Sequence, residues 1–366
     1  MASPVKRNLE PPESTEMDAV FLIEEDSFSA EELGEWFNLM IEQNAQLMAS
    51  PAILNYELGE RLTRQLFAMC NKLRIPPEAK INSALILNKY LNTLKLKASN
   101  LLLNESNIET RRQLHEQVRT RMLRHMPMRM VSAMQIASKM FTYRYTPALQ
   151  EFKKYLEAVD QPYLLEELVA SEMTVLEAID FDINNTNSPV AFLETVFQMF
   201  VMIHAKKKEF NAQKYWKASL QVLELVFLSF DETMKLIVKS YLHIKKDASH
   251  NLGRPSLQHL KCDYLLLSCG ILCVPVARLA GKDKLCEMAK ELSNLTSLDQ
   301  DHIISAANGI FHMIRRTQQK DENKHFVASK LDQTMWSMID EGCERRRMAR
   351  KRPAEDCGSR TDVSVY

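Results

Sequence analysis

Two charged side chains lie within otherwise apolar helical segments of this sequence, and their chemistry suits the capture of a protein partner. Lys139 interrupts the almost entirely apolar run RMVSAMQIASKMF, residues 129–141. Glu172 falls inside the apolar stripe that recurs at helical spacing along residues 164–183. A charge on a buried helix face is costly unless it is paired. An ammonium and a carboxylate so placed could form charge-assisted hydrogen bonds with unpaired backbone groups of another chain.

The periodicity leaves a second interpretation of these charges open. Around Lys139, the polar residues Ser132, Gln135 and Thr142 recur three or four positions apart and share one narrow helix face. This helix is therefore expected to be central in its bundle, with a single thin polar window. On the second interpretation, Lys139 and Glu172 are separate, half-exposed charges on the edges of two helices, where an ion contributes little.

The sequence contains no arrangement of residues that indicates catalysis. It has no nucleophile elbow, no HExxH, no phosphate loop and no CxxC pair. A helical spacing relates His259, Cys262, Cys269 and Cys273, which could suggest a metal, but the same segment is rich in leucine, which favours buried free thiols. We therefore predict a binding protein with no catalytic residues, no cofactor and no metal.

The composition predicts an all-helical protein. Only 8 of the 366 residues are glycine, whereas tight β-turns and phosphate loops require this residue. Lys+Arg and Asp+Glu both number 47, and this zero net charge argues against direct nucleic-acid binding. The most apolar run, residues 264–280, contains Pro275 and Arg278 and is shorter than a membrane span, so we predict a buried helix and no membrane association.

Proline, polar and charged stretches divide the chain into four parts. Residues 1–28 are rich in proline and acids and are expected to be disordered. Residues 29–187 should form an N-terminal helix and a first bundle of five helices, interrupted by a looser polar insert at about 92–126, after which Pro127 begins the next helix. A joint near residues 184–189, with Ser188 as helix cap and Pro189 in the first turn, leads to a second bundle over 188–320.

Residues 321–366 should form a C-terminal helix followed by a basic tail. The tail concentrates basic residues at Arg345, Arg346, Arg347, Arg350, Lys351 and Arg352. Such a cluster is typical of a nuclear-import segment or a nucleic-acid patch, and the simpler alternative is a solvated tail.

Two motifs in the predicted first bundle resemble those of the cyclins. QIASKM resembles the cyclin-box pattern in which an Ala-Ser-Lys lysine ends the central helix, and SEMTVLEAIDFDINNTNSPVAFLETVF resembles the pattern downstream. The resemblance covers roughly residues 53–200 and implies two consecutive five-helix bundles. It also implies that Lys139 and Glu172 contact the backbone of a cyclin-dependent kinase near its αC helix, and thereby align the catalytic groups of the kinase. Gln135, Met140 and Phe141 complete the predicted kinase-binding residues.

The departures from the usual cyclin pattern narrow the resemblance. Met140 and Phe141 follow the lysine where cyclins carry acids, Asn88-Lys89 replaces the usual Asp-Arg, and the usual first-helix motif is absent. RMVSAMQIASKM instead resembles the cyclin N-terminal domain-containing family of meiotic crossover designation. This resemblance implies a protein of the nucleus and chromosomes, with a cytoplasmic fraction, that works with a cyclin-dependent kinase and with recombination and mismatch-repair-type crossover factors.

Two alternatives to this function remain open at the level of sequence. The departures also suit a scaffold for recombination factors that keeps the fold but no longer binds a kinase. The same fold in general transcription factors binds DNA, which would require a basic face on the bundles themselves. Since the basic residues cluster at 111–129 and in the tail, we rank this last alternative below the other two.

Overall fold

The computed structural model describes eight stretches of the chain, and every element in them is a helix. The described residues are 30–49, 56–103, 107–142, 146–183, 188–204, 212–245, 257–280 and 283–322. The first helices are α1 (Ala30–Ala49), α2 (Glu60–Lys72), α3 (Pro77–Leu103), α4 (Ile108–Phe141), α5 (Leu149–Ala158) and α6 (Leu165–Ala178). They are followed by α7 (Pro189–His204), α8 (Ala212–Leu228), α9 (Phe230–Lys245), α10 (Leu257–Cys262), α11 (Tyr264–Ala280), α12 (Asp283–Thr296) and α13 (Gln300–Glu322). The predicted all-α class is confirmed.

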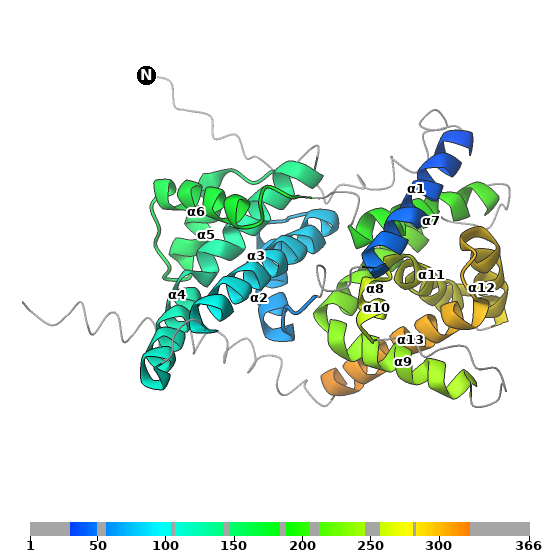
Figure 1. The fold of residues 1–366 in the computed structure, drawn as a ribbon. Coiled ribbons are helices and arrows are strands. Elements are labelled where there is room, and N and C mark those ends of the chain that lie inside the picture. The colour runs from blue at the N-terminus through cyan, green and yellow to red at the C-terminus, as the bar shows by residue number, and fades with distance from the viewer. Residues whose placement is uncertain are drawn as a thin grey trace, which may run out of the picture.

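The helices form two groups that lie side by side (Figure 1). In the first group, α4 packs against α3 and α6, and α2 and α5 pack against α3 and α6 respectively. In the second group, α11 contacts α7, α8, α12 and α13, while α9 lies along α13. Helix α7 begins at Pro189, as Ser188 and Pro189 predicted, and the Val190 N–H donates to Ser188 Oγ at 3.3 Å.

Helix α1 packs against α7, α10 and α11 of the second group, although the sequence-based division placed it with the first. The Asn44 side-chain amide donates to Asp263 Oδ1 at 2.9 Å, and Asn44 Oδ1 accepts from the Leu265 N–H at 3.2 Å. Because these bonds engage the beginning of α11, they hold α1 to a helix more than two hundred residues further along the chain.

The described part of the insert, residues 92–103 and 107–126, is helical, whereas the sequence predicted a looser segment. It consists of the end of α3 and the beginning of α4, and these two helices pack against each other. Asn107 Oδ1 caps α4 by accepting from the N–H groups of Glu109 at 2.9 Å and Thr110 at 3.4 Å. Pro127 therefore lies inside α4 and does not begin it. A proline inside a helix removes one backbone hydrogen bond and so destabilises the helix. Packing of α4 against α3 offsets this loss of stability.

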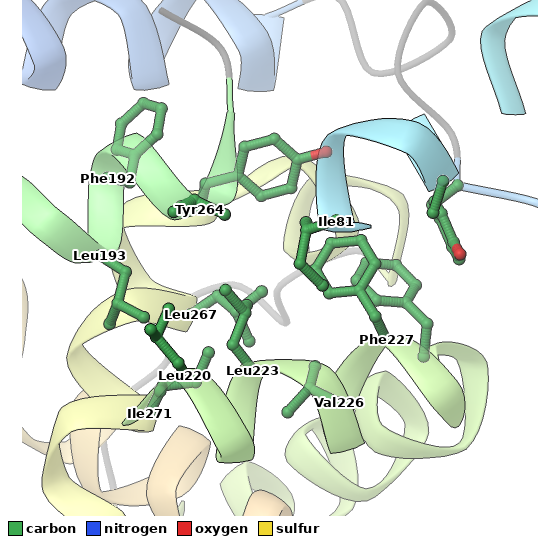
Figure 2. Packing of buried hydrophobic residues seen from close by; sticks show 14 of the residues in the cluster. Ile81, Phe192, Leu193, Leu220, Leu223, Val226, Phe227, Tyr264, Leu267 and Ile271 are labelled. Carbon is green, nitrogen blue, oxygen red and sulfur yellow. The ribbon is translucent and has the colours of Figure 1, made fainter. Parts of the chain in front are cut away.

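Apolar and ionic contacts join the two groups through α8. Figure 2 shows Ile81 of α3 beside Phe227 of α8, at one end of a core that continues to Tyr264 and Ile271 of α11. The ring centroids of Tyr56 and Phe227 are 5.1 Å apart. Next to this contact, buried Lys80 Nζ of α3 pairs with Glu224 Oε2 of α8 at 2.9 Å. A core residue network therefore crosses from one group to the other.

Candidate partner-binding face

Lys139 lies where helix α4 leaves the core. Every residue from Met130 to Ser138 is buried, and Lys139 and Met140 are the first exposed residues before the helix ends at Phe141. Residues 130–138 are buried on all sides because α3 and α6 both pack against α4. The ammonium also lies in the last turn, where a helix dipole favours positive charge.

Glu172 is presented by helix α6, whose buried face differs from the predicted stripe. The buried residues are Leu168, Ser171, Val175 and Ala178. Val169 and Met173 belong to the apolar stripe along residues 164–183, which the sequence predicted to be buried, but they are 55% and 49% exposed. Glu172 lies between them with its side chain only 15% exposed. Its position is thus at the boundary between the core and an exposed apolar surface.

Lys139 and Glu172 bind each other, so they are not separate charges. Lys139 Nζ lies 2.6 Å from Glu172 Oε1 and 2.8 Å from Oε2, although 33 residues separate them in the chain. The lysine side chain is 49% exposed, so the pair is open to solvent on the ammonium side. Together with exposed Met140, Val169 and Met173, it forms the α4–α6 face.

A polar network beneath this face fixes α4 against α6. Arg129 Nη1 donates to the Ser171 carbonyl oxygen at 3.1 Å and to Ser171 Oγ at 2.8 Å. Ser171 Oγ also lies 2.6 Å from Ser132 Oγ, and the Arg129 guanidinium stands 5.7 Å from the centroid of the Tyr90 ring. The part that Arg129 and Ser171 play beneath this face was not predicted from the sequence. A serine on the buried side of α6 next to Glu172 was the only indication of this network.

The other predicted site residues have different surroundings. Gln135 is 4% exposed and lies inside the bundle, which corrects its predicted place on a partner-facing surface. Residue 135 faces inward because helices cover α4 on several sides at this level. Met140 is exposed, whereas Phe141 is half-buried and packs on the core. The predicted import cluster at 345–352 lies outside the described residues.

Asn88 and Lys89, which replace the usual Asp-Arg, hold two neighbouring segments to α3. Asn88 is buried, and its Oδ1 accepts from the Glu57 N–H at 2.9 Å in the segment before α2. Lys89 Nζ donates to the Asp182 carbonyl oxygen at 3.0 Å and pairs with the Asp182 carboxylate in the segment after α6. The two residues thus connect the beginning and the end of the first group.

The cysteines near His259 are buried thiols in the structure. Cys262, Cys269 and Cys273 are buried and form no disulfide, and burial raises the pKa of each thiol above its ordinary value. Within the described ranges, no three His, Cys, Asp or Glu side chains come together as metal ligands. None of the described helices is long and apolar enough to cross a membrane.

The all-helical fold is consistent with a cyclin-like protein, and comparison with known proteins supports a cyclin-like family relationship. The chain is 26% identical over 145 residues to Cyclin N-terminal domain-containing protein 1 of Homo sapiens. It is 25% identical over 146 residues to the protein of the same name from Mus musculus. Each match covers 40% of this chain and 42% of the relative, so the chain spans about two fifths of the length of the curated relatives it matches. No protein-family model matches the chain.

Proposed function

We propose that this chain is a non-catalytic regulatory protein that binds a cyclin-dependent kinase through the α4–α6 face. The observation that carries the proposal is the Lys139–Glu172 pair, which joins the last turn of α4 to the middle of α6 and is flanked by exposed Met140, Val169 and Met173. Apolar side chains next to an accessible charge pair are typical of a surface that another protein covers.

The geometry of the pair leaves bonding capacity for a partner. An ammonium has three N–H donors, and the contacts of Lys139 with the two oxygens of Glu172 leave a donor for a carbonyl of another chain. The Glu172 carboxylate can likewise accept a further N–H. Since each group already holds the other in place, little side-chain entropy remains to be lost on binding. The surrounding apolar side chains would supply about 25 cal/mol for each Å² that the kinase buries.

The proposed cellular role is the maturation of meiotic crossovers in reciprocal recombination. It is supported by the likeness of RMVSAMQIASKM to the crossover-designation family and by the relatives that carry the cyclin N-terminal domain name. The protein would act in the nucleus on chromosomes, with recombination and mismatch-repair-type factors as further partners. In this role it would shift the kinase toward its active arrangement and would perform no chemistry itself.

Co-purification from germ-line extract tests kinase binding. The variant Lys139→Ala/Glu172→Ala should lose a cyclin-dependent kinase that the wild type retains. Lys284→Ala/Glu287→Ala is a matched control, because it removes another exposed lysine–glutamate pair, at 2.5 Å on α12, with the same charge change. Both variants should melt close to the wild type, because each removes both members of its ion pair and leaves no unpaired charge. A kinase retained by the folded Lys139/Glu172 variant would contradict the proposed interface.

A scaffold without kinase binding is the second candidate function. The observation that favours it is that Lys139 and Glu172 satisfy each other in the isolated chain, while Met140 and Phe141 replace the usual acids. In the same experiment, a scaffold would retain recombination proteins with the wild type and both variants, and would bring down no kinase in any lane.

A further inference from the structure

A groove of about 610 Å³ runs between the insert and the beginning of α2. Helices α2, α3 and α4 and the segment before α2 supply its aliphatic lining. These residues are Leu58, Leu62, Leu91, Val118, Met122 and Met126. Most of its lining residues belong to residues 92–126, so the groove exists because the insert continues α3 and α4 as packed helices. Leu123 also lines it and is 61% exposed. The described chain therefore leaves an apolar groove uncovered.

The groove carries positive charge along its edge. The charged residues that line it are the cations Lys95 and Arg119 and one carboxylate, Glu57. Lys95 Nζ pairs with Glu57 at 2.7 Å, and the Arg119 guanidinium lies 3.5 Å from Glu116, with both of these side chains 63% exposed. Such exposed pairs are weak and can exchange partners.

The positive charge extends over the whole insert. Residues 92–126 contain seven Lys or Arg against three Glu and no Asp, in a chain of zero net charge. Burial and then the neighbouring arginines Arg129, Arg121 and Arg124 lower the pKa of His125. The local field thus favours anionic side chains, in contrast to the neutral average of the chain.

We propose that this groove binds an acidic amphipathic helix of a partner protein. A groove between packed helices can accept a further helix. The aliphatic side of that helix would cover Leu123 and the floor of the groove. Carboxylates on the flanks of that helix would pair with Lys95 and Arg119. A nucleic acid would satisfy the arginines but would leave the apolar floor uncovered, so the combination of apolar floor and basic edge favours a protein.

The groove can be occupied independently of the α4–α6 face. Its lining on α4 ends at Met126, thirteen residues before Lys139, which is about 20 Å along the axis at 1.5 Å per residue. A partner helix in the groove and a kinase at Lys139 and Glu172 could therefore bind the same molecule at once. The inference also does not depend on whether a kinase binds.

Two synthetic peptides of equal length test this inference on the full chain by fluorescence anisotropy. One places leucines along one helical face with glutamates on the flanks, and its twin replaces every glutamate by lysine. The Leu/Glu peptide should bind at least about tenfold more tightly than its twin, a difference of roughly 1.4 kcal/mol. Failure of the Leu/Glu peptide to bind, or equal binding of the two, would overturn the proposal.

Two charge reversals on the same helix locate the binding. Arg119→Glu should weaken the Leu/Glu peptide by about tenfold and strengthen the Leu/Lys twin. Arg121→Glu is the matched control, since it makes the same charge change at an exposed position of α4 that does not line the groove. Leu123→Asp, also at an exposed position, should abolish peptide binding without unfolding the chain. If Arg119→Glu and Arg121→Glu change peptide binding equally, the groove is not the binding site. The same conclusion follows if a DNA duplex binds more tightly than the Leu/Glu peptide and both charge reversals weaken the DNA equally.

Discussion

Replacing Lys80 by methionine should destabilise the contact between the two helix groups. The Lys80 side chain is 7% exposed and that of Glu224 is 27% exposed, and their charged atoms are 2.9 Å apart. At an effective dielectric constant of 20 the direct attraction is roughly 6 kcal/mol, most of which only offsets the loss of hydration. Removing one partner of a fully buried pair typically costs about 3–5 kcal/mol. Because water can still reach Glu224, we expect a loss of about 2–3 kcal/mol for Lys80→Met.

The free energy of unfolding from urea titrations, followed by circular dichroism, measures this effect. Lys97→Met is the matched control, since it makes the same change at an exposed position of α3 and should cost less than about 0.5 kcal/mol. The double variant Lys80→Met/Glu224→Met should recover much of the loss, because it leaves no unpaired charge. A loss below about 1 kcal/mol for Lys80→Met, or a loss equal to that of Lys97→Met, would refute the reasoning.

Three further predictions concern a buried carboxyl group and two glycines. Burial raises the pKa of Asp263 above 3.8, so this carboxyl should contribute stability that is fully present below pH 3.8 and is lost as the pH rises through the raised folded value. The urea midpoint of Asp263→Asn, measured across acid pH, should lack this component, and an unchanged pH profile would contradict the assignment. A Cβ at Gly309 would stand 2.6 Å from the Cα of Ile237, so Gly309→Ala should cost several kcal/mol by forcing α13 away from α9. Gly34→Ala meets nothing within 4 Å and should instead stabilise α1 by about 0.5–1 kcal/mol in the same thermal-unfolding assay. Similar melting temperatures for the two alanine variants would show that α9 and α13 adapt easily.

The helical class and several element positions were predictable from the sequence. Few glycines and a helical spacing of apolar residues indicated helices throughout, and Ser188 with Pro189 marked the beginning of α7. These features depend on interactions within one or two turns, which the sequence contains directly. The insert was predicted as loose because its residues are mostly polar. Its helices depend on packing between α3 and α4, and polarity alone does not reveal that packing.

The sequence was less informative about which side chains are exposed. Periodicity assigned Val169 and Met173 to the core and Gln135 to a polar window, and the structure reverses all three positions. A helical pattern identifies an apolar side of a helix, but the neighbouring helices decide how much of that side is covered. The exposed apolar residues beside Glu172 are consequently a property of the packed bundle.

The sequence by itself determined that the chain forms helices, that Lys139 and Glu172 occupy unusual positions, and that the chain resembles the cyclins. Only the tertiary structure brought Lys139 to 2.6 Å from Glu172, placed Lys80 against Glu224 and made a groove from the insert. Helix periodicity and capping act over a few residues, so they are present in any short stretch of sequence. Contacts between residues 33 or 144 positions apart arise only when whole helices pack, because the burial of many side chains then offsets the entropy of closing the chain between them.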